Sequence, residues 1–213
     1  MNILSPFQET LLKHLGNSSL NDIFFLTGGT ALSAFFLQHR YSEDLDFFTA
    51  QPEQVPQVLP VLEKIALQLG VRIEIRRQFK TFLEVFLHRQ DGEVIKCDFA
   101  QDSPYRLQPK ARSEEFGIFL DSVLDISCNK LSALFDRSAA KDFVDVYFID
   151  RELFRFSELL QNARQKHVGL DNYWLAVSLL KAEELGPLPR MIKPVTIEEL
   201  KNFFLTQAKE LMK

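Results

Sequence analysis

The fold of this chain is decided by the stretch LTGGTAL at residues 26–32 and by RYSEDLDFF at residues 40–48. Residues 22–27 form a short apolar run, which predicts a strand. The Gly28-Gly29 pair permits backbone angles and close approaches that a side chain would block. Residues 30–39 are apolar with helical periodicity. The pattern therefore predicts a strand, a Gly-Gly turn, one helix and a second strand.

The turn is a candidate anion site. A helix that begins at Thr30 would point its free N–H groups, its dipole and the Thr30 hydroxyl at an anion, and a triphosphate suits that geometry. The alternative is an ordinary strand-turn-helix connection in which Thr30 only caps the helix. Gly-Gly-Thr alone does not separate the two interpretations.

Two carboxylates follow one helix later. In a strand, Asp44 and Asp46 project from one face while Leu45 and Phe47 point to the other. Mg²⁺, which prefers hard oxygen ligands, would relieve their repulsion and bridge to phosphate oxygens. A solvated strand end is the alternative, but the upstream Gly-Gly turn favours a site for a metal-bound nucleotide. The chemistry that this predicts is nucleotidyl transfer.

Asp98 is a candidate third carboxylate. Residues 71–76, 81–88 and 94–99 alternate as strands, and an Asp-Gly pair at 91–92 predicts a hairpin turn between the last two. Alternation places Asp98 on the same face of the strand as Lys96. The residues between them and beside them face the core. Asp98 is thus either a metal ligand or a base that deprotonates the acceptor, unless it is an exposed carboxylate paired with Lys96.

Three blocks carry a resemblance to a known family. They are GGTAL at 28–32, RYSEDLDF at 40–47, and the block DISCNKLSALFDRSAAKDFVDVY at 125–147. This arrangement resembles the AbiEii/AbiGii family of toxin nucleotidyltransferases, in the DNA polymerase β-like superfamily, from about residue 20 to about residue 150. A weaker similarity covers residues 187–204.

The resemblance implies a cytoplasmic bacterial enzyme that uses a nucleoside triphosphate, as the toxin of a toxin–antitoxin pair or in phage defence. Its implied partners are a tRNA or protein acceptor and a cognate antitoxin, and its implied cofactor is Mg²⁺, with Mn²⁺ as an alternative. The implied metal ligands are Asp44 and Asp46, and Asp98 is the candidate for a third ligand or for the base. The implied nucleotide-binding residues are Gly28, Gly29, Thr30, Arg40, Ser42 and Lys130, and Lys130 and Asp142 join the three aspartates as catalytic residues.

Spacing explains how Lys130 and Asp142 could act together. Residues 125–135 and 139–150 read as helices with a short break between them, so the two side chains could face each other across a helical hairpin. Lys130 would then meet the triphosphate and Asp142 would orient it. In the alternative, Lys130 is an exposed helix lysine and Asp142 pairs locally with Arg137 or Lys141.

Composition restricts the class of protein only weakly. The chain has 213 residues, of which 46% are hydrophobic and 25% charged, enough for one or two small domains. Its longest apolar runs are too short for a bilayer, and its polar first residues argue against a secretory signal, so a cytoplasmic protein without membrane association is expected. Cys97 and Cys128 form no disulfide framework or zinc pattern.

The charge pattern bears on the acceptor. A net charge of −4 argues against broad DNA binding but does not exclude RNA. Local cationic groups at 72–80, 110–112 and 151–155 could guide a nucleic acid toward an acidic cleft. The 20 phenylalanines are interpreted as packing rather than as base-stacking platforms.

These observations predict an α+β protein. A polymerase β-like sheet with flanking helices would occupy a domain of residues 1–112, and a mainly helical domain of residues 113–213 would close over the nucleotide. An acceptor nucleophile would attack the α-phosphorus and release pyrophosphate. A small-molecule nucleotidyltransferase and a non-catalytic nucleotide-binding module remain the alternatives.

Several elements outside the site are also predicted. Helices are expected at 6–15, with a capped start, and at 53–69, where Pro56 and Pro60 would delay or kink the helix. A strand is expected at 116–120. Further helices are expected at 152–166, 172–184 and 197–212.

Overall fold

The computed structural model describes residues 3–213, which form two compact units. Unit 1 consists of Met1–Phe35 and Ser42–Ser122, and unit 2 of Phe36–Tyr41 and Val123–Lys213. The domain boundary expected after residue 112 stays a prediction, because compact packing is a different property from independent folding.

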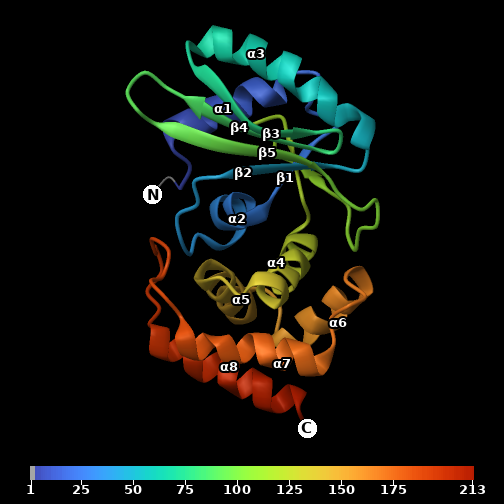
Figure 1. Ribbon diagram of the computed structural model, residues 1–213, viewed down its shortest axis with the longest axis vertical. Coiled ribbons are helices and arrows are strands. Elements are labelled where there is room, and N and C mark those ends of the chain that lie inside the picture. The colour runs from blue at the N-terminus through green and yellow to red at the C-terminus, as the bar shows by residue number, and fades with distance from the viewer. Residues whose placement is uncertain (1–2) are drawn as a thin grey trace. The chain divides into compact units, whose positions relative to one another are not determined.

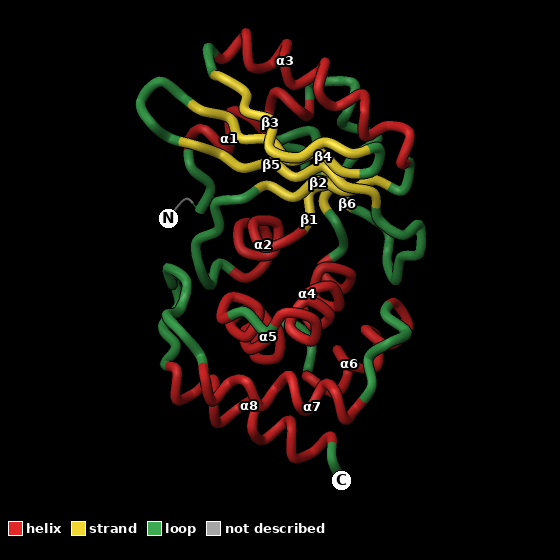
Figure 2. The backbone as a smooth tube through the Cα atoms, viewed as in Figure 1, coloured by secondary structure: helices red, strands yellow, loops and turns green. Residues whose placement is uncertain are grey.

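Unit 1 is built on a mixed seven-stranded sheet in the order β3-β4-β5-β2-β1-β7-β6, drawn in Figures 1 and 2. The pairs β2–β5 and β1–β7 are parallel and the others antiparallel. This sheet with its helices confirms the α+β class. The strands are β1 (Phe25–Thr27), β2 (Leu45–Thr49), β3 (Arg72–Phe79), β4 (Phe82–His88), β5 (Val94–Gln101), β6 (Ala111–Arg112) and β7 (Phe119–Leu120).

One face of this sheet is the core of unit 1. Helices α1 (Pro6–Gly16) and α3 (Val58–Leu69) lie on the same side of the sheet (Figure 1). On that side Phe47 of β2 stacks on Phe99 of β5, with ring centroids 4.9 Å apart. Cys97 is also fully buried, so the predicted alternation along β5 is confirmed. The opposite face carries the polar residues of β2 and β5.

Local sequence explains most element ends in unit 1. Helix α1 has the predicted capping box, formed by Ser5 and Gln8. A 3-10 helix spans Pro52–Gln57 before α3 begins, as expected of the interior proline Pro56, which lacks an N–H donor. The helix expected at 30–39 is instead a short α-helix, α2 (Gly28–Ala31), that continues as a π-helix over Leu32–Leu37. Nothing in the periodicity indicated the π-helix.

Two strand predictions differ from the structure at their ends. β1 starts at Phe25 instead of residue 22, because the preceding residues form turns. The strand expected at 116–120 is shortened to β7, and the two-residue β6 beside it was not predicted. Both short strands are defined by their partners across the sheet, which local sequence does not reveal.

Unit 2 is helical, as predicted for the C-terminal half (Figure 2). Its core includes an edge-to-face contact between Phe143 and Phe204, with centroids 4.9 Å apart. The segment 36–41 joins this unit through the carbonyl of His39, which accepts hydrogen bonds from the N–H groups of Ile192 and Lys193. No helix within residues 3–213 is long and apolar enough to cross a membrane. The α-helices are α4 (Val123–Arg137), α5 (Ala140–Glu152), α6 (Phe156–Lys166), α7 (Asn172–Leu180) and α8 (Ile197–Leu211).

Candidate active site

Three carboxylates lie side by side on the polar face of the sheet. In the strand register Asp46 of β2 is opposite Asp98 of β5, and Asp98 is opposite Glu84 of β4. Paired residues on neighbouring strands point to the same face, about 5 Å apart. We call these three residues the acidic row. It extends to Arg77 of β3 on one side and to Thr27 of β1 on the other.

Asp44 lies one residue before β2, in a loop, and not in the strand as predicted. Its main-chain carbonyl accepts a hydrogen bond from the hydroxyl of Thr30, which is fully buried. This hydroxyl therefore holds the Asp44 loop, whereas the sequence predicted that it points at an anion. The main-chain N–H groups remain as the turn's candidate phosphate donors.

The Gly-Gly turn and the acidic row meet at Gly28. This residue has a φ of +73°, and a Cβ atom built on it would lie 2.0 Å from Oδ2 of Asp46. The missing side chain therefore allows the Asp46 carboxylate to lie against the turn. The structure thus brings together the two motifs that the sequence singled out.

Lys96 provides a positive charge within the acidic row. Its Nζ lies 2.6 Å from Oδ2 of Asp98 and 3.6 Å from Oε2 of Glu84. Burial acts to lower the pKa of Lys96, but the hydrogen bond to Asp98 and the nearby charges raise it above its ordinary value. The pairing of Asp98 with Lys96, left open by the sequence, is present, although Asp98 is largely buried.

Asp98 keeps one carboxylate oxygen free. Its Oδ1 is buried and, within residues 3–213, has no hydrogen-bond partner. Burial raises the pKa of Asp98, and the negative charges of Glu84 and Asp44 add to this rise while Lys96 opposes it. Glu84 differs, because its hydrogen bond from Arg77, 2.6 Å long, lowers its pKa. Asp98 is thus the more basic carboxylate of these two.

The donor set suits a hard divalent cation. Asp44, Asp46 and the free oxygen of Asp98 offer the carboxylate oxygens that Mg²⁺ and Mn²⁺ prefer. In the described part of the chain, however, no group of three or more His, Cys, Asp or Glu side chains is arranged to hold a metal ion. The metal-ligand role of Asp44, Asp46 and Asp98 stays a prediction.

A further polar contact in unit 1 was not predicted. Asp121, only 1% exposed, accepts hydrogen bonds from the Thr27 hydroxyl at 2.9 Å and from Arg106. Thr27 lies opposite Asp46 in the register, so this contact adjoins the acidic row. No local motif could have identified it, because Asp121 is 94 residues from Thr27 and meets it only through the pairing of β1 with β7.

The predicted residues Arg40 and Lys130 meet in unit 2 at a carboxylate that the sequence assigned no role. Asp145, fully buried, accepts hydrogen bonds from Nε and Nη2 of Arg40 at 2.6 and 2.9 Å. Nζ of Lys130 lies 2.8 Å from its Oδ2, and Nε2 of His39 lies 2.7 Å from its Oδ1. We call these four residues the Asp145 cluster. Burial would raise the pKa of Asp145, but Lys130 and Arg40 hold it well below its ordinary value.

Lys130 and Asp142 have different partners. Asp142 accepts hydrogen bonds from Nε and Nη2 of Arg137 at 2.8 and 2.7 Å, which is the local pairing left open by the sequence. Lys130 is 7% exposed, so its interpretation as an exposed helix lysine is wrong. Among the other predicted nucleotide-binding residues, Gly29 is buried and the carbonyl of Ser42 accepts a hydrogen bond from Gln8.

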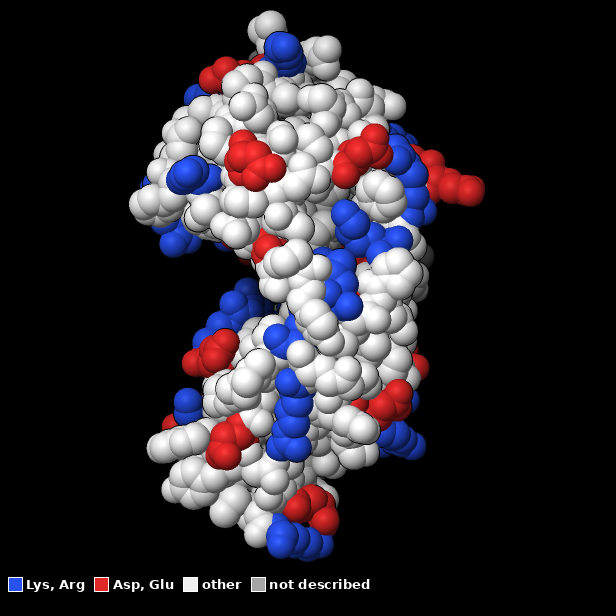
Figure 3. All heavy atoms as spheres, turned by 90° about the vertical axis from the view of Figure 1, so that its right-hand side faces the viewer, with Lys and Arg blue, Asp and Glu red and all other residues white. Residues whose placement is uncertain are grey.

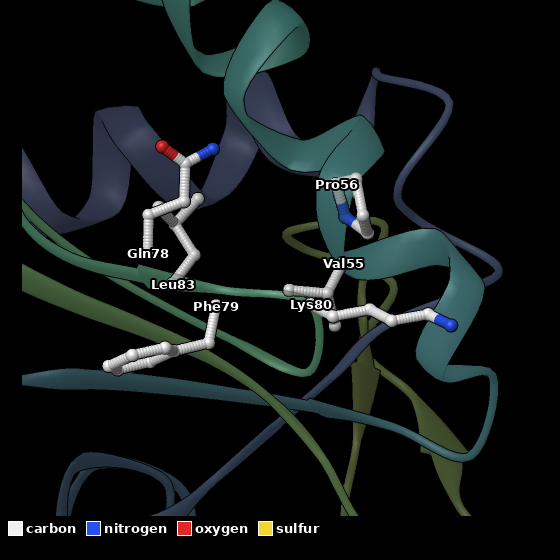
Figure 4. A pocket seen from close by; sticks show the side chains of 6 residues that line it. All are labelled: Val55, Pro56, Gln78, Phe79, Lys80 and Leu83. Atoms are coloured by element: carbon white, nitrogen blue, oxygen red, sulfur yellow. The ribbon is translucent and has the colours of Figure 1, made fainter.

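A hollow in unit 1 is separate from the acidic row. It lies between the 3-10 helix 52–57 and the β3–β4 hairpin, as Figure 4 shows. No carboxylate lines it, so it lacks the ligands of a metal site. Its lining residues are Val55, Pro56, Gln78, Phe79, Lys80 and Leu83.

Comparisons with known proteins identify the family of this chain. The family described as the nucleotidyl transferase AbiEii toxin of type IV toxin–antitoxin systems matches residues 10–212. An uncharacterised protein of Aquifex aeolicus (strain VF5) is 30% identical over 209 residues, covering 96% of this chain and 95% of that protein.

Solved structures show the same fold. JHP933 from Helicobacter pylori has a TM-score of 0.61 at 22% identity, covering 95% of this chain and 87% of that chain. The nucleotidyltransferase toxin MenT4 from Mycobacterium tuberculosis H37Rv has a TM-score of 0.58 at 15% identity, covering 97% and 82%. The family match spans nearly the whole sequence, and the chain therefore belongs to the AbiEii family of nucleotidyl transferase toxins.

Proposed function

We propose that this protein is a metal-dependent nucleotidyltransferase that moves a nucleoside monophosphate from a nucleoside triphosphate to an RNA or protein acceptor. The observation that carries the proposal is the contact of the Asp46 carboxylate with the glycine turn at Gly28, inside a row of carboxylates. A phosphate-binding turn beside metal-ligating carboxylates is what a metal-bound triphosphate requires.

Asp44 and Asp46 would hold Mg²⁺ or Mn²⁺. Asp98, with its free oxygen, would be either a third ligand or the base. When bound, the ion would act as a Lewis acid that neutralises the charge developing on the phosphate oxygens. The main-chain N–H groups of residues 28–30 would bind the phosphates from the other side. In unit 2, Asp145 holds the ammonium of Lys130 and the guanidinium of Arg40, and the nucleotide-binding role of these two residues stays a prediction.

The transfer step requires a base and a leaving group. The acceptor oxygen forms a bond to the α-phosphorus, the bond from that phosphorus to the bridging oxygen of the β-phosphate breaks, and pyrophosphate leaves. Where Asp98 acts as the base instead of as a third metal ligand, the acceptor's proton passes to its carboxylate, whose raised pKa suits this role. Positioning dominates this chemistry, so no covalent protein intermediate is needed.

The biological setting follows from the family. Its description as a toxin of type IV toxin–antitoxin systems supports a cognate antitoxin as partner. A cytoplasmic site of action is part of this proposal. An antitoxin gene next to this one would support that assignment.

Labelled triphosphates test the proposed activity directly. The protein is incubated with Mg²⁺ and each α-labelled nucleoside triphosphate in turn, together with total tRNA or with a nuclease-treated protein lysate. Acid-insoluble label that RNase removes identifies an RNA acceptor, and label that protease removes identifies a protein acceptor. If neither acceptor is labelled with any triphosphate, the proposal is wrong.

Asp46→Asn is the matched test of the site. It removes a charged metal ligand without changing core volume, so we expect the transfer rate to fall at least about 100-fold while the unfolding midpoint changes little. Glu63→Gln makes the same chemical change on an exposed position of α3 and should keep full activity. Comparable turnover of Asp46→Asn and the wild type would exclude this metal-binding role.

A further inference from the structure

A row of aromatic residues lies on the same sheet face as the acidic row. In the register Phe48 of β2 is opposite Phe25 of β1, and Phe25 is opposite Phe119 of β7. Phe48 and Phe25 are each two residues along their strands from Asp46 and Thr27, a step of about 7 Å that keeps the same face. The aromatic row therefore lies next to the acidic row.

Three cationic side chains cover the β1–β7 end of this aromatic row. The Arg106 guanidinium carbon lies 4.3 Å from the ring centroid of Phe25, and Nζ of Lys110 lies 5.0 Å from the centroids of both Phe25 and Phe119. Arg112 pairs with Phe119 in the register, and its guanidinium carbon lies 5.3 Å from that ring. We call these five residues the basic–aromatic surface. Figure 3 shows basic side chains adjoining one another on unit 1, with acidic ones beside them.

The cations of this surface are only partly neutralised. Arg112 pairs with Asp22 at 2.7 Å, and Arg106 pairs with Asp121 and Asp102. Nε of Arg106 is nevertheless buried and, within residues 3–213, has no hydrogen-bond partner. Lys110 is half-buried and makes no ion pair with any described residue, so its contacts here are the two rings.

An unpaired, partly desolvated ammonium ion attracts an anion strongly. The ring faces compensate only part of the hydration that Lys110 loses. Burial and the neighbouring charge of Arg106 lower the pKa of Lys110, consistent with positive charge that lacks a counterion. A phosphate group would supply that counterion and could also accept a hydrogen bond from Arg106.

We propose that the basic–aromatic surface binds the backbone phosphates of an RNA acceptor beside its reacting end. Its role in transfer rests on the proposed nucleotidyltransferase function. The chain has a net charge of −4, so the protein as a whole is not complementary to a polyanion. This local positive surface is complementary to one. RNA carries a phosphate at every nucleotide, so one phosphate can lie at Lys110 while the reacting end lies at the neighbouring acidic row.

RNA binding without chemistry tests this surface. Fluorescence anisotropy of labelled tRNA is measured with EDTA present and without triphosphate, so the readout is independent of metal and transfer. For Lys110→Ala we expect about 3- to 10-fold weaker binding and a salt dependence whose slope falls by about one, as the loss of one phosphate contact requires. Lys110→Arg keeps the charge and should retain most of the affinity.

Lys64→Ala is the matched control. It removes the same charge from an exposed position of α3, on the opposite side of the sheet, and should leave both the affinity and the salt slope unchanged. Equal losses for Lys64→Ala and Lys110→Ala would mean that only net charge matters, and the surface assignment would be wrong.

Steady-state kinetics separate the RNA from the other partners. Lys110→Ala should raise KM for the RNA acceptor and leave KM for the triphosphate unchanged. A change confined to the triphosphate KM would instead place the triphosphate at this surface, and label found only on protein, with no RNA bound, would also overturn the proposal.

The two proposals fail in different ways. If RNA binding depends on Lys110 but no triphosphate supports transfer, the proposed function fails and the RNA-binding surface stands. If RNA is labelled normally and Lys110→Ala has wild-type affinity and KM, the function stands and the surface fails.

Discussion

At the residue scale, the candidate site depends on the absence of a Cβ atom at Gly28. The backbone of Gly28 is left-handed, with a φ of +73°. The carboxylate of Asp46 occupies the space that a side chain at this position would fill. An L-amino acid at this position would be strained by the backbone and would also displace Asp46. Backbone angle and close approach are thus both reasons for glycine here.

Gly28→Ala should separate these two effects when compared with Gly70→Ala. Gly70 has a similar φ of +64° but nothing within 4 Å of an added Cβ, so its variant should lose only about 1–2 kcal/mol in urea unfolding. Gly28→Ala should lose more stability and also its binding of a fluorescent nucleotide analogue. Equal stability losses with nucleotide binding intact would show that Asp46 accommodates the methyl group.

Thr30→Val should report on the position of Asp44. The substitution keeps the shape of the side chain but removes the hydroxyl that donates to the Asp44 carbonyl. We expect a stability loss of about 1 kcal/mol and a larger effect on transfer, about 10-fold in kcat, since the loop that carries the proposed metal ligand Asp44 is released. Thr30→Ser keeps the hydroxyl and should restore most of kcat; failure of this rescue would contradict the role.

At the element scale, one carboxylate connects three segments of unit 2. Asp145 of α5 accepts from Lys130 of α4 and from Arg40 and His39 of the segment 36–41. Two cations and an imidazole around one fully buried carboxylate form a network in which every member contacts Asp145. The network fixes the segment that immediately precedes Ser42 and Asp44 in sequence.

Asp145→Asn should therefore be among the more destabilising single changes in this protein. It removes the negative charge that the buried cations Arg40 and Lys130 share, which costs about 3–5 kcal/mol. Urea unfolding measures this loss, and Asp136→Asn, an exposed position at the end of α4, should stay within about 0.5 kcal/mol of the wild type. A loss below about 1 kcal/mol would show that the network contributes little.

Asp145→Asn should also change how the free energy of unfolding depends on pH in acid. The pKa of Asp145 lies well below its ordinary value of 3.8 in the folded protein, so near and below that pH the unfolded chain binds a proton that the folded chain does not. Stability from this carboxylate is therefore fully present above pH 5 or so and is lost as pH falls further. Asp145→Asn should show a shallower decline of stability between about pH 4 and pH 2 than the wild type.

At the scale of the whole molecule, the chain passes between the two units three times. It leaves unit 1 after Phe35, returns at Ser42 and leaves again after Ser122. Each unit also contains one buried cysteine, Cys97 in unit 1 and Cys128 in unit 2. Burial raises the pKa of both thiols, that of Cys128 to about 12, so both are protected from alkylation in the folded state.

Thiol labelling should show that the two units unfold together. Unfolding of unit 2 would release the segment 36–41, which contains the last two residues of the π-helix and leads directly into the Asp44 loop of unit 1. We expect Cys97 and Cys128 to become reactive to a pulse of iodoacetamide at the same urea concentration, as read by mass spectrometry. Cys97→Ala and Cys128→Ala assign each signal, and clearly separate midpoints would show independent units.

Much of this protein could be read from local sequence. The capping residues of α1, the hairpin signal at residues 91–92, the alternation along β5 and the helical periodicity after residue 122 each act over a few neighbouring residues. The pairing of the Gly-Gly turn with Asp46 could also be predicted, since strand, turn, short helix and strand leave little freedom between them. The α+β class and the site of the two motifs followed from these short-range patterns.

Only the tertiary structure determines which side chains far apart in the sequence come into contact. Asp145 rather than Asp142 holds Lys130, because helix packing and the placement of the segment 36–41 select the partner of a buried cation. Asp121 meets Thr27, and Lys110 contacts Phe25, only after β1 pairs with β7. A buried charge requires whichever partner the packed structure places within reach, and sequence spacing does not encode that distance.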